Sequence, residues 1–220
     1  MKLFIDTANL QEIREIAAWG VLDGVTTNPT LIAKEGVDIR ARVAEICDVV
    51  PGPVSAEVVA QTHDEMVAEG KDLAQIAPNV YVKLAFGEEG LKACRELTEL
   101  GIHTNVTLVF SPAQAMLAGR AGATLLSPFL GRVDDIGNDS MAVLGEIVGI
   151  FRTHRYETQV LAASLRHPRH VVDAAKTGAH IGTLPYAVFK QMLGHPLTDI
   201  GAKRFLEDWN ELQAKLPPQP

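Results

Sequence analysis

Short apolar runs alternate with amphipathic segments along the whole chain. Eight runs have the residue types and length of β-strands, at residues 3–6, 24–27, 54–58, 80–85, 103–108, 124–129, 158–163 and 180–184. Between them, seven segments repeat apolar residues at helical spacing, at residues 10–19, 39–50, 64–76, 88–100, 112–121, 139–152 and 168–176. The pattern therefore predicts regular alternation of strands and helices.

Such alternation predicts a parallel sheet whose strands are joined by helical crossovers. Eight strand–helix units in 220 residues average about 27 residues each, a size that suits a closed (β/α)8 barrel. An open doubly wound sheet is the alternative. It would have roughly five or six strands and a glycine-rich first turn, whereas the first strand here runs into Asp6-Thr7-Ala8-Asn9. We therefore predict an α/β fold, a single (β/α)8 TIM barrel, with residues 1–220 forming one domain.

A further amphipathic segment, residues 200–216, follows the eighth unit. Phe205, Leu206 and Trp209 recur in it at helical spacing. The chain then closes with Pro217 and Pro218, which cannot continue a helix. We predict an extra C-terminal helix that covers either the barrel or a neighbouring subunit.

Charge and cysteine content narrow the class of protein. Twenty Lys and Arg against 27 Asp and Glu give a net charge of -7 without a basic run, so a nucleic acid would be repelled. Cys47 and Cys94 are far apart and lack the spacing of a metal site or a disulfide framework. The first apolar run is too short for a signal peptide, and no stretch approaches a membrane span. We expect a cytoplasmic protein with no nucleic-acid or membrane partner and no metal or other cofactor.

The active site of a (β/α)8 barrel lies at the C-terminal ends of its strands. Every predicted strand except the last contributes polar residues at its C-terminal end: Asp6, Thr26 with Asn28, Glu57, Lys83, Asn105 with Thr107, Ser127 with Arg132, and Ser164 with Arg166. We expect these side chains to converge on one mouth of the barrel.

Lys83 lies inside the apolar run 80–85. Alternation places its side chain on the interior face with that of Tyr81. An ammonium there loses its hydration, which favours the neutral amine that forms a Schiff base with a carbonyl. A lysine held only in a buried ion pair, with Glu57 or Asp6, fits the run equally well.

The two carboxylates could serve the same chemistry. Reaction through an iminium needs proton transfers to and from hydroxyl groups, which Asp6 and Glu57 can provide. Each could instead be a strand-end or helix-capping acid, because Asp6 closely precedes a helix start at Asn9. Because both carboxylates are expected to face Lys83, the pair favours a catalytic role over a structural one.

Neutral side chains in the same positions suit a hydroxylated substrate. The hydroxyl of Thr107 can hold a water, and the amides of Asn28 and Asn105 can bind substrate hydroxyls. A turn role is the alternative for the amides, above all for Asn28 before Pro29.

Two arginines indicate a phosphate. Arg132 and Arg166 follow the sixth and seventh strands, Ser164 lies close by, and (β/α)8 barrels often bind phosphate in this region. Surface arginines are commonly only solvated, which leaves that alternative open. We interpret His167 and His170 as solvated residues at a helix start rather than metal ligands.

Five segments, in order, resemble the transaldolase family, particularly the small-subunit branch that includes the fructose-6-phosphate aldolases: Phe4-Ile5-Asp6-Thr7-Ala8, Gly24-Val25-Thr26-Thr27-Asn28-Pro29-Thr30-Leu31, Val82-Lys83-Leu84, Asn105-Val106-Thr107-Leu108-Val109-Phe110-Ser111 and Ser127-Pro128-Phe129-Leu130-Gly131-Arg132. The resemblance implies a metal-independent class I mechanism on a (β/α)8 barrel. Lys83 would condense with sedoheptulose 7-phosphate or fructose 6-phosphate and retain a dihydroxyacetone unit. That unit would pass to glyceraldehyde 3-phosphate or erythrose 4-phosphate, as in the pentose phosphate pathway.

The resemblance also implies roles for individual residues. Asp6 would move the proton during carbon–carbon cleavage, and Glu57 with Thr107 would hold the water of Schiff-base formation and hydrolysis. The remaining implied substrate contacts are Asn28 and Asn105 on the dihydroxyacetone hydroxyls, Arg132, Ser164 and Arg166 around the phosphate, and Thr26 nearby without a defined role.

Three positions favour transfer over simple aldol cleavage. The aldolase branch carries glutamine, alanine and tyrosine where this chain has Glu57, Ser127 and Phe129. The small members form pentamers that stack into decamers, which implies self-association through residues 200–216. Two other functions stay open: an aldolase that releases free dihydroxyacetone, and a non-catalytic barrel that binds a phosphosugar.

Overall fold

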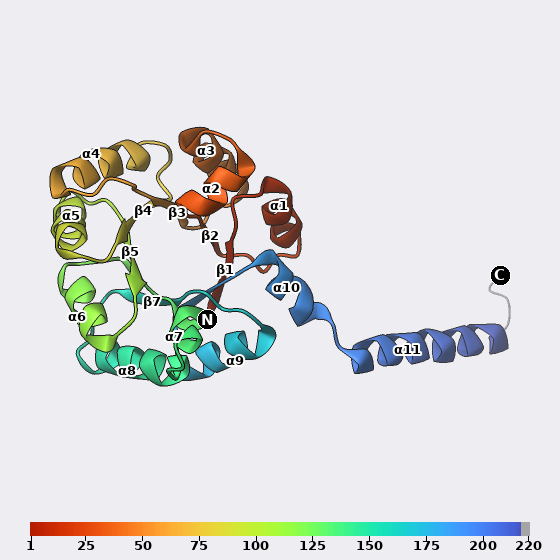
Figure 1. Ribbon diagram of the computed structural model, residues 1–220. Helices are drawn as coiled ribbons and strands as arrows, with labels where there is room; N and C mark the ends of the chain where they lie inside the picture. Colours follow the sequence, from red (N-terminus) through yellow and green to blue (C-terminus); the bar gives the residue numbers. More distant parts are fainter. Residues whose placement is uncertain (217–220) are drawn as a thin grey trace.

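Eight parallel strands close into a barrel in the computed structural model, which describes residues 1–216 (Figure 1). The strands follow one another around the barrel in chain order, and β8 pairs with β1 to close it. Their bounds are β1 Lys2–Asp6, β2 Gly24–Thr26, β3 Val54–Glu57, β4 Val80–Ala85, β5 Thr104–Val109, β6 Leu125–Pro128, β7 Gln159–Ala162 and β8 Ile181–Leu184. The predicted barrel and all eight strands are confirmed.

Helices surround the barrel. Those predicted from the pattern are α1 Leu10–Ala18, α3 Ile39–Val49, α4 His63–Ala74, α5 Glu88–Glu99, α6 Pro112–Arg120, α8 Ser140–Thr153 and α9 Pro168–Thr177. Three further helices were not predicted: α2 Pro29–Glu35, α7 Leu130–Asp135 and α10 Tyr186–Leu193. They are short, so apolar residues hardly repeat within them.

Local sequence explains where several helices begin and end. Asn9 caps α1, because its side chain accepts hydrogen bonds from the backbone N–H groups of Gln11 and Glu12. Gly178 ends α9 with a φ of 92°, a conformation that favours glycine.

Apolar side chains fill part of the barrel interior. Phe4, Leu125, Leu161, Ala163 and Ile181 form a buried cluster. A larger core lies between the strands and the surrounding helices. Polar side chains gather at the C-terminal ends of the strands, as is usual in (β/α)8 barrels.

The C-terminal helix α11 spans Pro196–Lys215 and begins earlier than predicted. It projects away from the barrel (Figure 1), and none of its residues is buried. Phe205 and Trp209 are 74% and 57% exposed. The helix therefore does not cover its own barrel, which removes one of the two predicted arrangements. The predicted proline-rich end, residues 217–220, lies outside the described residues.

Within residues 1–216, no helix combines the length and apolar character needed to cross a bilayer.

Candidate active site

Strand register brings the predicted residues to neighbouring positions. Asp6 on β1 is the Cα partner of Thr26 on β2, and Glu57 on β3 is the partner of Lys83 on β4. Lys83 is in turn paired with Asn105 on β5. Side chains at paired positions of parallel strands point to the same face, so these groups share the barrel interior.

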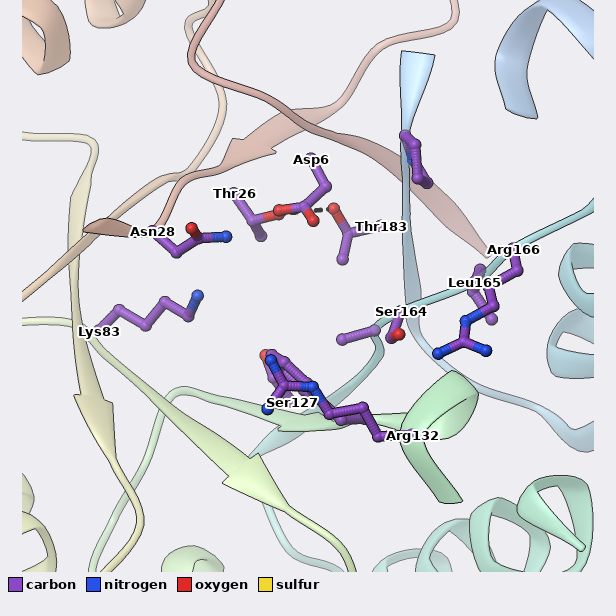
Figure 2. A pocket seen from close by; sticks show the side chains of 13 residues that line it. Asp6, Thr26, Asn28, Lys83, Ser127, Arg132, Ser164, Leu165, Arg166 and Thr183 are labelled. Carbon is purple, nitrogen blue, oxygen red and sulfur yellow. Dashed lines mark hydrogen bonds between the residues drawn. The ribbon is translucent and has the colours of Figure 1, made fainter. Parts of the chain in front are cut away.

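Lys83 forms a buried ion pair. Its Nζ lies 2.9 Å from Oε2 of Glu57 and donates a hydrogen bond of 3.0 Å to the backbone carbonyl of Thr27. The amine also faces an open cavity (Figure 2). The two alternatives for Lys83, a Schiff-base lysine and a lysine held in a buried ion pair, are therefore compatible. The glutamate that pairs with the ammonium can also take up its proton.

Two cavities meet at Lys83. The first has a volume of about 290 Å³ and is lined by Asp6, Thr26, Asn28, Lys83, Ser127, Phe129, Arg132, Ala163, Ser164, Leu165, Arg166, Thr183 and Pro185. The second, of about 390 Å³, is lined by Asn28, Pro29, Thr30, Leu31, Glu57, Lys83, Thr107, Leu108, Phe129 and Arg132. The amine of Lys83 thus has room on both sides for a carbonyl compound and for water.

Asp6 stands across the first cavity from Lys83 (Figure 2). Burial raises the pKa of its carboxyl above the ordinary aspartate value, although the hydrogen bond from Thr26 and the charge of Lys83 oppose that change. Oγ1 of Thr26 donates to Oδ1 of Asp6 over 2.7 Å. A carboxylate with a raised pKa is suited to accept and return a proton.

Thr107 carries a polar atom without a partner. Its hydroxyl oxygen is buried and makes no hydrogen bond to any residue in the range 1–216. The residue lines the second cavity together with Glu57. Buried hydroxyls normally have a partner, and a bound water is the usual one where protein offers none.

The two asparagines occupy different positions. Asn28 caps α2 by accepting from the N–H of Leu31 at 3.0 Å, while its amide nitrogen points into the cavity (Figure 2). Asn105 is fully buried and lines neither cavity. Its amide donates to Ser55 at 3.0 Å and accepts from Ser127 at 2.7 Å. Ser127, rather than Asn105, forms the cavity wall.

The arginines lie at the far end of the first cavity. Arg166 forms a two-pronged ion pair with Asp135 at the end of α7, and this contact lowers the pKa of Asp135. The guanidinium of Arg132 lies 5.1 Å from the centre of the Phe129 ring. Both arginines are exposed enough to meet a ligand phosphate.

Gly131 allows the two loops of this end to approach closely. A Cβ at this position would come within 2.5 Å of Nε of Arg166 and 2.8 Å of Oγ of Ser164. Ser164 itself has a φ of 59°, an uncommon value for a residue other than glycine. Strain of this kind gathers at functional sites.

Some features of the site differ from expectation. The eighth strand does contribute a polar residue, because Thr183 lines the first cavity. Asp135, the partner of Arg166, was also not among the predicted site residues. His170 is not solvated as predicted, since its Nε2 lies 2.9 Å from Asp134 and its side chain is only 13% exposed. No group of three or more potential His, Cys, Asp or Glu metal ligands occurs within the described part of the chain.

Fold and site together define a (β/α)8 barrel with a buried lysine–glutamate pair at the C-terminal ends of its strands. Among solved structures, a putative fructose-1,6-bisphosphate aldolase from Coccidioides immitis shares the fold, with a TM-score of 0.56, 16% identity and coverage of 98% of this chain and 80% of that one. The chain belongs to the transaldolase/fructose-6-phosphate aldolase family, whose model matches residues 3–216.

Relatives of similar length carry the name probable transaldolase. The protein from Bacillus cereus strain ZK is 59% identical over 98% of this chain and 100% of its own length. Those from Shouchella clausii and Clostridium acetobutylicum are 58% and 56% identical, each over 96% of this chain and 98% of its own length.

Proposed function

We propose that the protein is a transaldolase that moves a dihydroxyacetone unit from a ketose phosphate to an aldose phosphate. Its donors would be sedoheptulose 7-phosphate or fructose 6-phosphate, and its acceptors glyceraldehyde 3-phosphate or erythrose 4-phosphate. The observation that carries the proposal is the buried Lys83–Glu57 pair, which faces Asp6 across a cavity with arginines at its far end.

The first half-reaction begins at Lys83. Its neutral amine adds to the C2 carbonyl of the ketose phosphate, and loss of water gives an iminium. Asp6 accepts the proton of the C4 hydroxyl, the C3–C4 bond breaks, and its electron pair moves into the iminium to give an enamine. An aldose phosphate leaves.

The second half-reaction reverses these steps with a new aldehyde. The enamine carbon attacks the acceptor carbonyl, and Asp6 returns its proton to the alkoxide that forms. Water then adds to the iminium and releases Lys83. Thr107 and Glu57 flank the cavity in which that water would be bound and activated.

The far end of the first cavity suits the substrate phosphate. Arg132 and Arg166 supply charged donors there, and Ser164 supplies a hydroxyl. Asn28 and Ser127 would bind the hydroxyls of the dihydroxyacetone unit, with Asn105 holding Ser127 from beneath and Thr26 acting on Asp6.

An aldolase that releases free dihydroxyacetone is the second candidate, because the family includes both activities. Phe129 favours transfer, since its ring lines both cavities and carries no hydroxyl to position water. Glu57 and Ser127 favour it by resemblance. A non-catalytic phosphosugar-binding barrel gives no reason to bury a lysine beside a carboxylate.

We further propose that α11 binds a second copy of the chain, in a pentamer or decamer. Its exposed apolar residues, Leu197, Ile200, Phe205, Leu206, Trp209 and Leu212, have no partner among residues 1–216. A helix with so much apolar surface requires a covering partner, and the barrel of a neighbouring copy fits a homo-oligomer. We also propose that the protein is cytoplasmic and acts in pentose phosphate metabolism.

The test compares release of glyceraldehyde 3-phosphate from fructose 6-phosphate with and without erythrose 4-phosphate. A transaldolase releases more than one equivalent only when the acceptor is present. Lys83→Met should abolish release and the borohydride-trapped adduct, whereas Lys92→Met, on the exposed face of α5, should retain both. Sustained release without acceptor identifies an aldolase, and absence of any Lys83 adduct contradicts both enzymes.

A further inference from the structure

A chain of three polar side chains crosses three neighbouring strands beside the cavity. Thr183 on β8 and Thr26 on β2 lie on either side of β1, which carries Asp6. Oγ1 of Thr26 lies 2.7 Å from Oδ1 of Asp6 and also 2.7 Å from Oγ1 of Thr183. Figure 2 shows the three side chains grouped on one side of the cavity.

The number of available protons determines which hydroxyl donates and which accepts in these hydrogen bonds. A threonine hydroxyl has one hydrogen to donate and can accept others. When Asp6 is ionised, its carboxylate can only accept, so the hydrogen of Thr26 is used in the bond to Asp6. The bond between the two threonines must therefore be donated by Thr183.

We propose that Thr183 is a positioning residue of the reaction, whose hydroxyl donates to Thr26 and so fixes the Thr26 hydroxyl in the orientation that donates to Asp6. The proposal rests on the proposed function, in which Asp6 transfers the proton. Thr183 is 2% exposed, so solvent cannot easily replace its hydroxyl.

Two linked hydroxyls suit a carboxylate that must act as a base. A bond accepted by Thr26 polarises its hydroxyl and strengthens the bond that it donates. The two threonines thereby stabilise the ionised form of Asp6 without placing a second positive charge beside it. Both residues are β-branched, which restricts rotation of their side chains.

The charged groups around Asp6 lie on other elements. Lys83 from β4, with its partner Glu57 from β3, faces it across the cavity, and Arg132 and Arg166 lie at the far end. The two strands packed against β1 contribute no ionisable group near Asp6, only the hydroxyls of Thr26 and Thr183. Any change in the titration of Asp6 after substitution of Thr183 would therefore report on the hydroxyl chain.

The experiment measures the pH dependence of kcat/KM in wild type, Thr183→Val, Thr183→Ser, Thr26→Val and the double valine variant. Thr183→Val should move the acid limb upward by roughly 0.2 to 0.6 pH unit, from the mutual strengthening of linked hydrogen bonds. Thr183→Ser should restore the wild-type profile. Thr26→Val should move the limb by roughly one to two pH units, because it removes the bond to the carboxylate itself.

The double variant separates positioning from a general structural effect. If Thr183 acts through Thr26, adding Thr183→Val to Thr26→Val should produce no further shift of the acid limb. An unchanged limb in Thr183→Val, an equal loss of rate at every pH, or a full additional shift in the double variant would overturn the proposal. Thr183→Ala takes the place of the valine variant if the latter does not fold.

A second readout does not depend on turnover. The Asp6 carboxyl can be titrated by ¹³C NMR of aspartate-labelled protein, with Asp6→Asn to assign its signal, and the same variants should shift it in the same order. If wild type lacks a borohydride adduct at Lys83 but the NMR shifts appear, the proposed function fails and the hydroxyl chain stands. If wild type forms the adduct at Lys83 but the variants show no shift in the NMR titration, the proposed function stands and the role of Thr183 is overturned.

Discussion

Replacing Glu57 by glutamine removes the counter-charge of a buried lysine. The side chains of Lys83 and Glu57 are only 5% and 14% exposed, and Nζ lies 2.9 Å from Oε2. Removing one partner of a buried pair typically costs about 3–5 kcal/mol, because the other charge is left uncompensated. The glutamine oxygen and the carbonyl of Thr27 remain as acceptors for Lys83. We therefore expect a loss of about 3 kcal/mol, the lower end of that range, at neutral pH.

Unfolding measurements at fixed protein concentration test this value. For a chain of 220 residues, a loss of that size should lower the melting temperature by roughly 6–12 °C. Keeping the concentration fixed is necessary because the proposed self-association would also contribute to stability.

A double-mutant cycle with Lys83→Met decides whether the reasoning is correct. Replacing both members of a buried pair by neutral groups is often neutral or stabilising. Glu57→Gln with Lys83→Met should therefore be more stable than Glu57→Gln alone. The reasoning is refuted if the single variant is as stable as wild type, or if the added Lys83→Met substitution destabilises it further.

Three further predictions concern other parts of the molecule. Asp6→Asn should be more stable than wild type at pH 7, because burial raises the pKa of Asp6 in the folded state. This stability advantage should shrink as the pH falls toward the ordinary aspartate pKa of 3.8. Urea unfolding at several pH values measures the difference in stability, and a difference that does not change with pH would contradict the prediction. Asp135→Asn should lower KM for fructose 6-phosphate roughly threefold to tenfold by releasing Arg166 and removing a negative charge, with KM for unphosphorylated fructose unchanged as the control. Phe205→Glu with Trp209→Glu should reduce the oligomer seen by analytical ultracentrifugation, whereas Lys203→Ala on the same helix should not, and an unchanged oligomer would show that α11 is not the contact.

The fold could be predicted because each strand and each long helix repeats its own spacing of apolar residues. The strand-end rule then located Lys83 and Glu57 without further information, since alternation alone turns both side chains inward. The short helices α2 and α7 could not be found this way, as one or two turns show no period. The direction of α11 could not be predicted either, because amphipathic spacing indicates a helix but does not specify what its apolar face packs against.

Depth within the barrel was harder to predict than orientation. Asn105 points inward as expected, but Ser55 and Ser127 bind it beneath the cavity floor. Thr183 was overlooked because threonine is common in strands and attracts no notice there. Asp135 was overlooked because its role depends on the approach of two loops at Gly131, a contact between segments far apart in sequence.

The two carboxylates at the mouth of the barrel are suited to different tasks by their neighbours. Glu57 lies beside an ammonium, so its negative charge is balanced and it can exchange a proton with Lys83 and with water near Thr107. Asp6 receives a hydrogen bond from the neutral hydroxyl of Thr26, which is itself bonded to Thr183, and burial raises the pKa of Asp6. Because burial disfavours the anionic form of Asp6, this carboxylate takes a proton more readily than an exposed aspartate does. Carbon–carbon cleavage needs such a base, and this is why we assign that step to Asp6 and the water-dependent steps to Glu57.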